Sequence, residues 1–124
     1  MINRHHRCED AKANLREAQA HWEVAKSRLA TANAEFATAS TTLGNARVAL
    51  SQARNDYEQH KGDKDPSVAR RFEAKLGEAQ TAFDAAQSRK DAAKPTQERA
   101  QRDEEDLKYK VARLEIERDQ ACNN

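Results

Sequence analysis

The chain has 124 residues, of which 35% are charged and 5% aromatic, with only three glycines and two prolines. This composition favours long helices over a sheet or a compact globule. A mean hydropathy of −1.11 is also typical of disordered chains, but the regular repeat described below argues against disorder. The net charge of +1 comes from 22 basic and 21 acidic residues mixed along the chain, so no basic stripe that would bind nucleic acid or a membrane surface is expected.

The first residues argue against a targeting segment. Met1 to Arg7 carry positive charge, but no hydrophobic stretch follows them, so a secretory signal peptide is not expected. The chain also lacks a run of about 18 apolar residues, the length that a spanning helix needs. Direct insertion into a membrane is therefore not expected either.

Residues 11–57 contain two columns of residues that each repeat every seven positions. One column is small and the other, offset by four, is bulky: Ala11, Ala18, Ala25, Ala32, Ala39, Ala46 and Ala53, then Leu15, Trp22, Leu29, Phe36, Leu43, Leu50 and Tyr57. A 4-3 repeat places both columns on one seam of a helix and predicts a left-handed coiled coil with close helix approach. We expect this helix at about residues 5–60. Gly44, next to the seam, indicates either close approach of a partner or a tolerated weak point.

The repeat is interrupted at residues 60–66. Gly62 suits the left-handed position just past a helix end, Asp65 suits an N-cap, and Pro66 suits the first turn of a following helix. These residues predict a tight turn at 61–65 near the middle of the chain. The second half can then run back beside the first.

The 4-3 spacing resumes after Ala69 and extends to Ala121. A fold point near Asp63 pairs residues whose numbers add up to about 125 or 126, which sets Leu50 against Leu76 and Leu15 against Val111. We therefore predict an all-α fold: a long antiparallel two-helix coiled-coil hairpin over residues 1–124, with its second helix at about 66–122. An intramolecular hairpin also predicts a monomer in preference to a parallel dimer.

The second strand of the seam is irregular in its middle. Three polar residues stand in its bulky column opposite Trp22, Leu29 and Phe36, namely Glu104, Gln97 and Lys90. Either their methylenes cover the partner helix while their polar ends stay hydrated, or this stretch opens and accepts another helix. Pro95 removes one helical hydrogen bond, so we expect a kink or local break near residues 91–96.

The two cysteines, Cys8 and Cys122, fall at the same end of the expected hairpin. The register places Cys8 opposite Arg118, about one turn from Cys122, so a disulfide is expected, with two unrelated thiols as the alternative. His5 and His6 add residue types found in zinc sites, but their short, irregular spacing does not predict a metal centre. We also find no catalytic constellation and expect no cofactor and no enzymatic activity, because two paired helices offer no concave pocket.

The end of the hairpin between the two helices is rich in aromatic and charged residues. We expect this tip to be the binding site, with the following candidate residues: Tyr57, His60, Lys61, Asp63, Lys64, Asp65, Pro66, Val68, Arg70, Arg71 and Phe72. Aromatic and arginine side chains are the types that anchor protein interfaces. The alternative interpretation is a solvated loop followed by the first layer of the seam.

The chain resembles the receptor-binding domain of the E-group colicins and related bacteriocins. The resembling residues are the Asp65-Pro66 turn, the run from Arg70 to Ala74, and the segment from Ala79 to Ala86, together with alanine-rich heptads such as Ala11 to Leu15. The resemblance implies a helical hairpin whose tip binds an outer-membrane protein receptor of a target bacterium. It also implies an extracellular protein that is released without a signal peptide.

Two points remain open at this stage. The tip is shorter and more charged than the apolar, glycine-containing tip of the family members that bind the cobalamin transporter, so the receptor is not assigned. A different class of protein has the same expected fold, namely the coiled-coil stalk proteins of type III secretion and flagellar export. That alternative predicts function along the seam at residues 88–104 or at the termini, a cytosolic location and no disulfide.

Overall fold

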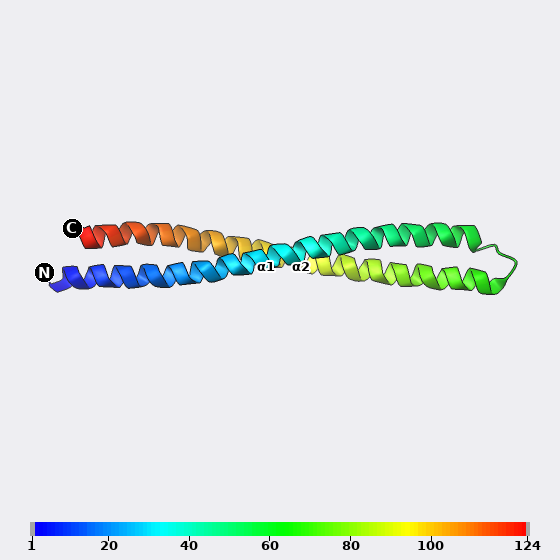
Figure 1. The fold of residues 1–124 in the computed structure, drawn as a ribbon, viewed down its shortest axis with the longest axis horizontal. Coiled ribbons are helices and arrows are strands. Elements are labelled where there is room, and N and C mark those ends of the chain that lie inside the picture. The colour runs from blue at the N-terminus through cyan, green and yellow to red at the C-terminus, as the bar shows by residue number, and fades with distance from the viewer. Residues whose placement is uncertain (1, 124) are drawn as a thin grey trace. The chain divides into compact units, whose positions relative to one another are not determined.

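The computed structural model describes the backbone of residues 2–123 and the side chains of residues 5–123. Two long helices account for nearly all of this chain: α1 spans Ile2–His60 and α2 spans Pro66–Asn123. They run in opposite directions and are joined by the loop at residues 61–65 (Figure 1). No strand occurs among the described residues. The predicted all-α helical hairpin, with its turn at 61–65, is confirmed.

The chain divides into two compact units. The terminal unit comprises Met1–Asn33 and Thr96–Asn124, and the tip unit comprises Ala34–Pro95. In the terminal unit, a core cluster forms from Leu15, Ala18, Val111 and Leu114, and Trp22 packs against it. In the tip unit, the buried side chains are Ala39, Leu43, Leu50 and Ala86. Each unit therefore has a thin core made from one face of each helix.

The seam predicted from the heptads is the packed face of both helices. All fourteen members of the two columns in α1 are buried or half-buried, and Ala39 is 0% exposed. The small column contributes Ala18, Ala25 and Ala32 to the buried set. Because alanine has almost no side-chain bulk, these positions let the opposite helix approach closely, and the larger residues fill the layers between them.

Side-chain contacts agree with the predicted register inside each unit. In the terminal unit, Trp22 contacts Glu104, and in the tip unit, Lys90 lies over the ring of Phe36. The residue numbers of each pair add up to 126, as the fold point predicts. A loop of five residues that begins right after His60 leaves little freedom for either helix to shift, so the loop sets the register.

Two expectations about helix-weakening residues need correction. α2 continues through Pro95, so the local break expected near residues 91–96 does not occur, and a bend there stays a prediction. The flanking seam residues Ala93 and Gln97 are half-buried, and such packing supports a helix that lacks one hydrogen bond.

A Cβ atom added at Gly44 would meet nothing within 4 Å, so Gly44 does not mark close helix approach. It is a tolerated weak point.

Candidate functional site

The candidate tip begins where α1 ends. The backbone N–H of Lys61 donates to the carbonyl of Tyr57 over 2.8 Å, and the N–H of Asp63 donates to the carbonyl of His60 over 3.1 Å. Gly62 lies in this turn, but no described residue has a positive φ. The expectation of a left-handed Gly62 is therefore wrong. The turn closes without left-handed backbone geometry, and the N–H groups of Lys61 and Asp63 are satisfied by the last carbonyls of α1.

Asp65 caps the start of α2. Its Oδ1 accepts hydrogen bonds from the backbone N–H of Ser67 at 2.9 Å and from the Ser67 hydroxyl at 2.8 Å. These bonds stabilise the charged form and lower the pKa of the Asp65 carboxyl below its ordinary value, with the hydroxyl bond as the larger cause. The N–H of Asp65 in turn donates to Oδ1 of Asp63 over 3.0 Å. The predicted N-cap, with Pro66 in the first turn, is confirmed.

Phe72 is the centre of a cluster that joins the two helices. The ring of His60, the last residue of α1, stacks on the ring of Phe72 with centroids 4.1 Å apart and planes 28° apart. The guanidinium carbon of Arg71 lies 5.2 Å from the Phe72 ring centroid, and Nζ of Lys75 lies 5.4 Å from it. We call these four residues the Phe72 cluster. Both cations are within the distance at which a ring face attracts positive charge.

The structure also adds two residues that the sequence analysis did not include in the tip. Lys75 belongs to the Phe72 cluster, and its signal in the sequence is its position three residues after Phe72, which places both on one helix face. Glu58, in the last turn of α1, forms an ion pair over 2.6 Å with Lys61, the first residue of the loop. This carboxylate raises the pKa of Lys61, first through the hydrogen bond and then through its charge.

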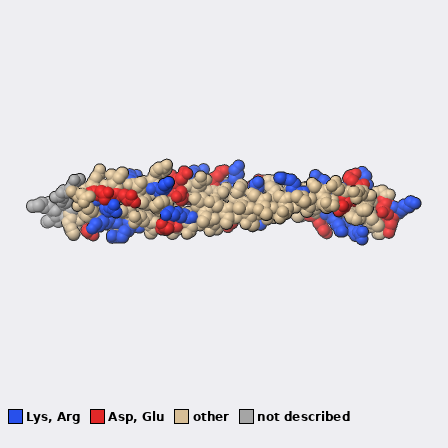
Figure 2. Space-filling model, turned by 45° about the horizontal axis from the view of Figure 1, so that its top comes forward, with Lys and Arg blue, Asp and Glu red and all other residues tan. Residues whose placement is uncertain are grey.

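The remaining candidate residues divide into two groups. Tyr57 and Val68 are half-buried and belong to the packing of the two helices near the loop. Lys64, Arg70 and Asp63 are exposed, as are Arg71 and Lys75. Basic and acidic side chains lie next to one another at this end of the tip unit (Figure 2). The surface of the tip is therefore neither uniformly basic nor uniformly acidic.

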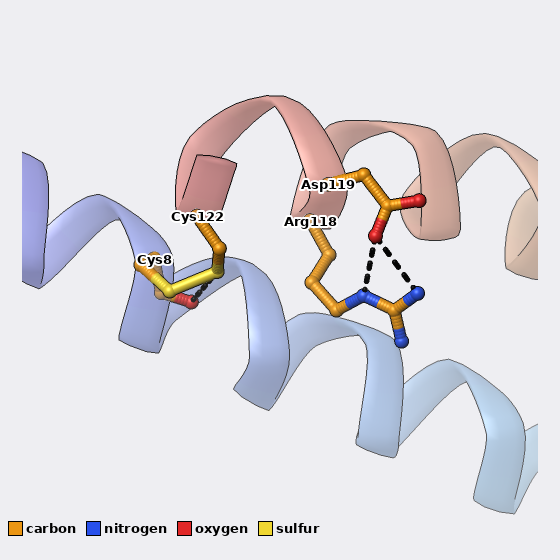
Figure 3. Close-up of polar contacts among 4 residues, drawn as sticks. All are labelled: Cys8, Arg118, Asp119 and Cys122. Carbon is orange, nitrogen blue, oxygen red and sulfur yellow. Dashed lines mark hydrogen bonds and ion pairs between the residues drawn. A yellow bond between two sulfur atoms is a disulfide. The ribbon is translucent and has the colours of Figure 1, made fainter. Parts of the chain in front are cut away.

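Cys8 and Cys122 form a disulfide in the terminal unit (Figure 3). Their Cα atoms are 4.7 Å apart, and Sγ of Cys122 also lies 3.7 Å from the carbonyl oxygen of Cys8. Arg118, the residue that the register places opposite Cys8, directs its guanidinium to the neighbouring Asp119 at 3.0 and 3.1 Å. The predicted disulfide is confirmed. The two sulfurs are bonded to each other, which removes the free thiolates that a zinc site would use.

The polar residues of the seam each contact α1. The indole N–H of Trp22 donates to Oε1 of Glu104 over 3.2 Å, and Nζ of Lys26 lies 3.7 Å from the centroid of the Trp22 ring. The side-chain amide of Gln97 donates to Oδ1 of Asn33 over 2.8 Å. The expectation that these polar ends only face water is therefore incomplete, because in the terminal unit Glu104 and Gln97 each form a hydrogen bond with a side chain of α1.

Other features of the described residues concern metal binding, membrane crossing and surface depressions. Residues 5–123 contain no group of three or more His, Cys, Asp or Glu side chains that could hold a metal ion. Within the described part of the chain, neither helix is long and apolar enough to cross a membrane. A surface depression in the terminal unit is lined by Arg7, Glu117, Gln120 and Ala121, beside the disulfide.

No family model matches the chain, and no curated protein matches it. The evidence on function is therefore in the residues of the tip and in the pattern of the sequence.

Proposed function

We propose that this chain is the receptor-binding module of a bacteriocin, and that its tip binds an outer-membrane protein of a target bacterium. The observation that carries the proposal is the Phe72 cluster. His60 and Phe72 stack across the two helices, with Arg71 and Lys75 beside them, at the point where the chain reverses. Aromatic and arginine side chains are the most frequent anchors of protein interfaces.

The order of the loop supports the same proposal. Over residues 57–68, three backbone hydrogen bonds and the Asp63 and Asp65 side chains fix the backbone on both sides of Gly62. A loop that is already ordered loses less conformational entropy when it binds a partner. The sequence resemblance to the E-group colicins, which includes Asp65, Pro66 and the Arg70 to Ala74 run, supplies the class of protein and of receptor.

The disulfide fits the proposed extracellular location. Disulfides persist in oxidising environments and are rare in the cytosol, and the Cys8–Cys122 bond closes the terminal unit. The same bond argues against the cytosolic stalk proteins of type III secretion and flagellar export, which are the second candidate function. In our proposal the tip acts by binding and the protein has no enzymatic activity.

One observation favours the second candidate. Tyr109 and Ile116 are 71% and 59% exposed, and they lie seven residues apart, on one face of α2. A helix that docked on this face would cover both side chains, as an export partner would. Variants Tyr109→Ser and Ile116→Ser test this face, because the receptor-binding proposal does not use it.

The experiment that tests the proposal is binding of the full chain to outer-membrane preparations from related Gram-negative bacteria. Wild type is compared with the double variant Arg71→Ala, Phe72→Ala. The matched control is Phe83→Ala, Arg89→Ala, which removes another half-buried phenylalanine and another exposed arginine of α2 in the same unit. We expect saturable binding that falls at least about tenfold in the tip variant and stays near the wild-type affinity in the control.

Each other outcome has a clear meaning. Binding that is lost equally in both double variants would assign the effect to weakened helix packing and not to the tip. No saturable binding to any preparation would reject the receptor-binding proposal. Binding that survives both double variants but is lost on Tyr109→Ser, Ile116→Ser would move the site to the outer face of α2.

A further inference from the structure

The tip is nearly neutral by formal charge. Residues 56–75 contain five acidic and five basic side chains, namely Asp56, Glu58, Asp63, Asp65 and Glu73 against Lys61, Lys64, Arg70, Arg71 and Lys75. A count of this kind predicts no preference for an anionic or a cationic partner. The preference depends instead on which of these charges already have partners within the chain.

The acidic side chains of the tip are mostly engaged within the protein. Asp65 accepts two hydrogen bonds from Ser67 as the cap of α2. Asp63 accepts the N–H of Asp65, and Glu58 pairs with Lys61. Asp56 accepts the side-chain amide of Gln52 over 3.3 Å. Four of the five carboxylates therefore face a donor of the chain itself, and Glu73 is the fifth.

The basic side chains show the opposite behaviour. Lys61 is paired with Glu58, whereas Lys64, Arg70, Arg71 and Lys75 have no carboxylate within 4.0 Å among the described residues. Arg71 and Lys75 lie beside Phe72, whose ring attracts positive charge but accepts no conventional hydrogen bond. Their N–H groups thus remain available to a ligand. The formal charges of the tip nearly cancel, but the charged groups that lack a partner within the chain and can contact a ligand are mostly cationic.

From this imbalance we infer that the Phe72 cluster binds an acidic patch on the receptor protein, formed by Asp or Glu side chains. The inference rests on the proposed function and names the chemistry of its partner. Arg71 supplies a planar fork that matches a carboxylate, Lys75 supplies a second positive charge on the same face of α2, and the His60–Phe72 stack supplies an apolar surface between the helices.

The mixed charge of the tip favours a protein over a phosphate-rich surface. Asp63, Asp65 and Glu73 lie among the four unpaired cations, and their carboxylates would be repelled by a dense layer of phosphates. A receptor with a few discrete carboxylates can reach Arg71 and Lys75 and leave the acidic residues of the tip in water. Charge complementarity of this local kind gives specificity and a salt-dependent association rate.

The test compares three double variants of the full chain on the same outer-membrane preparations. Arg71→Gln, Lys75→Gln removes both charges, Arg71→Lys, Lys75→Arg keeps them, and Arg89→Gln, Lys94→Gln removes two exposed charges of α2 away from the tip. We expect the first variant to bind about tenfold more weakly at about 50 mM NaCl and to lose most of the salt dependence of the wild type. The third variant should keep both properties. The second should keep the salt dependence but lose part of the affinity, because Arg71→Lys removes the planar fork.

Two further arms identify the source of the negative charge. Protease treatment of the membranes should abolish wild-type binding, and vesicles of purified lipopolysaccharide should not bind the chain. Capture by lipopolysaccharide vesicles at the affinity of whole membranes, or binding that resists protease, would overturn the assignment to a protein carboxylate patch.

The outcomes also separate this inference from the proposed function. If Arg71→Ala, Phe72→Ala abolishes binding but Arg71→Gln, Lys75→Gln binds as the wild type does at both low and high salt, the tip is the binding site and the acidic partner is wrong. If the wild type binds no preparation, the proposed function itself is rejected, and the inference with it.

Discussion

The terminal unit and the tip unit are made from the same two helices but are closed in different ways. The helices of the tip unit are joined by a loop of five residues, which an N-cap and three backbone hydrogen bonds fix. In the terminal unit, the two helical segments are separated along the chain by the whole of residues 34–95, and the Cys8–Cys122 disulfide joins them. The difference between the two units indicates that a thin seam needs a short covalent connection between its helices, either a loop of the backbone or a disulfide.

The two units also differ in what fills the seam. The tip unit buries Ala39, Leu43, Leu50 and Ala86, all apolar. The terminal unit has a core cluster near the disulfide, and beyond it the half-buried pair of Trp22 with Glu104 and the exposed pair of Asn33 with Gln97. A buried apolar layer stabilises a helix pair by removing apolar surface from water. A polar pair adds less stability but favours one register of the two helices.

The largest expected effect comes from removing the disulfide. With Cys8→Ser and Cys122→Ser, the unfolding free energy should fall by about 4 to 5 kcal/mol, because the bond closes a loop with a sequence separation of 114 residues. Hydrogen exchange should show the greatest loss of protection in the terminal unit, where the two segments have no other covalent connection nearby. Urea unfolding of the serine variant and of the reduced wild type should give the same result. Equal unfolding free energies with and without the disulfide would show that the terminal unit does not depend on this connection.

The next effect concerns close packing in the tip unit. Ala39 is 0% exposed, so Ala39→Leu forces extra methylene groups between the helices and should cost about 1 to 3 kcal/mol in urea unfolding. The control is Ala37→Leu, which places the same side chain on the exposed face of α1 and should change stability by a few tenths of a kcal/mol. If both leucines had the same effect, the alanine column would not be the site of closest approach.

A smaller effect is expected at the polar pair of the terminal unit. Glu104→Leu leaves the half-buried Trp22 N–H without its acceptor and should cost about 1 kcal/mol, whereas Glu104→Gln keeps an acceptor oxygen and should cost less. Trp22 is the single tryptophan, so its fluorescence reports unfolding at this point of the seam. A leucine variant more stable than the wild type would mean that apolar burial outweighs the hydrogen bond here.

The sequence predicted the fold well because its main signals are local and repeated. Fourteen seam positions at strict spacing define the packed face of α1, and Asp65 with Pro66 defines the start of α2. The Cys8–Cys122 disulfide was also predicted, although the register places Arg118, about one turn from Cys122, opposite Cys8.

The features that the sequence did not predict depend on geometry between residues far apart in the chain. The stacking of His60 on Phe72 depends on the angle at which α1 enters the loop and α2 leaves it. The spacing of residues in the sequence does not specify that angle. The Gln97 amide reaches Asn33, one turn from Leu29, because a long side chain extends along the helix axis. A glycine just past a helix end often adopts a left-handed conformation, which is why the sequence predicts one at Gly62. The hydrogen bonds of this turn form without a left-handed residue.

The smallest expected effect is the pH dependence of the cap in the tip unit. The hydrogen bonds from Ser67 lower the pKa of Asp65 below its ordinary value of 3.8, so they favour the carboxylate in the folded state. The stabilisation is therefore present above pH 3.8 and is lost as the pH falls through the lower pKa of the folded protein. Asp65 is fully exposed, so the change should be modest.

Asp65→Asn isolates this contribution, because asparagine also caps helices but does not titrate. The difference in unfolding free energy between wild type and Asp65→Asn should be constant from about pH 6 to about pH 4 and should then decrease toward about pH 2. All other carboxylates titrate in both proteins, so their effects cancel in the difference. A difference that grows in acid would mean that the Asp65 carboxylate destabilises the folded tip, contrary to the hydrogen bonds that it accepts.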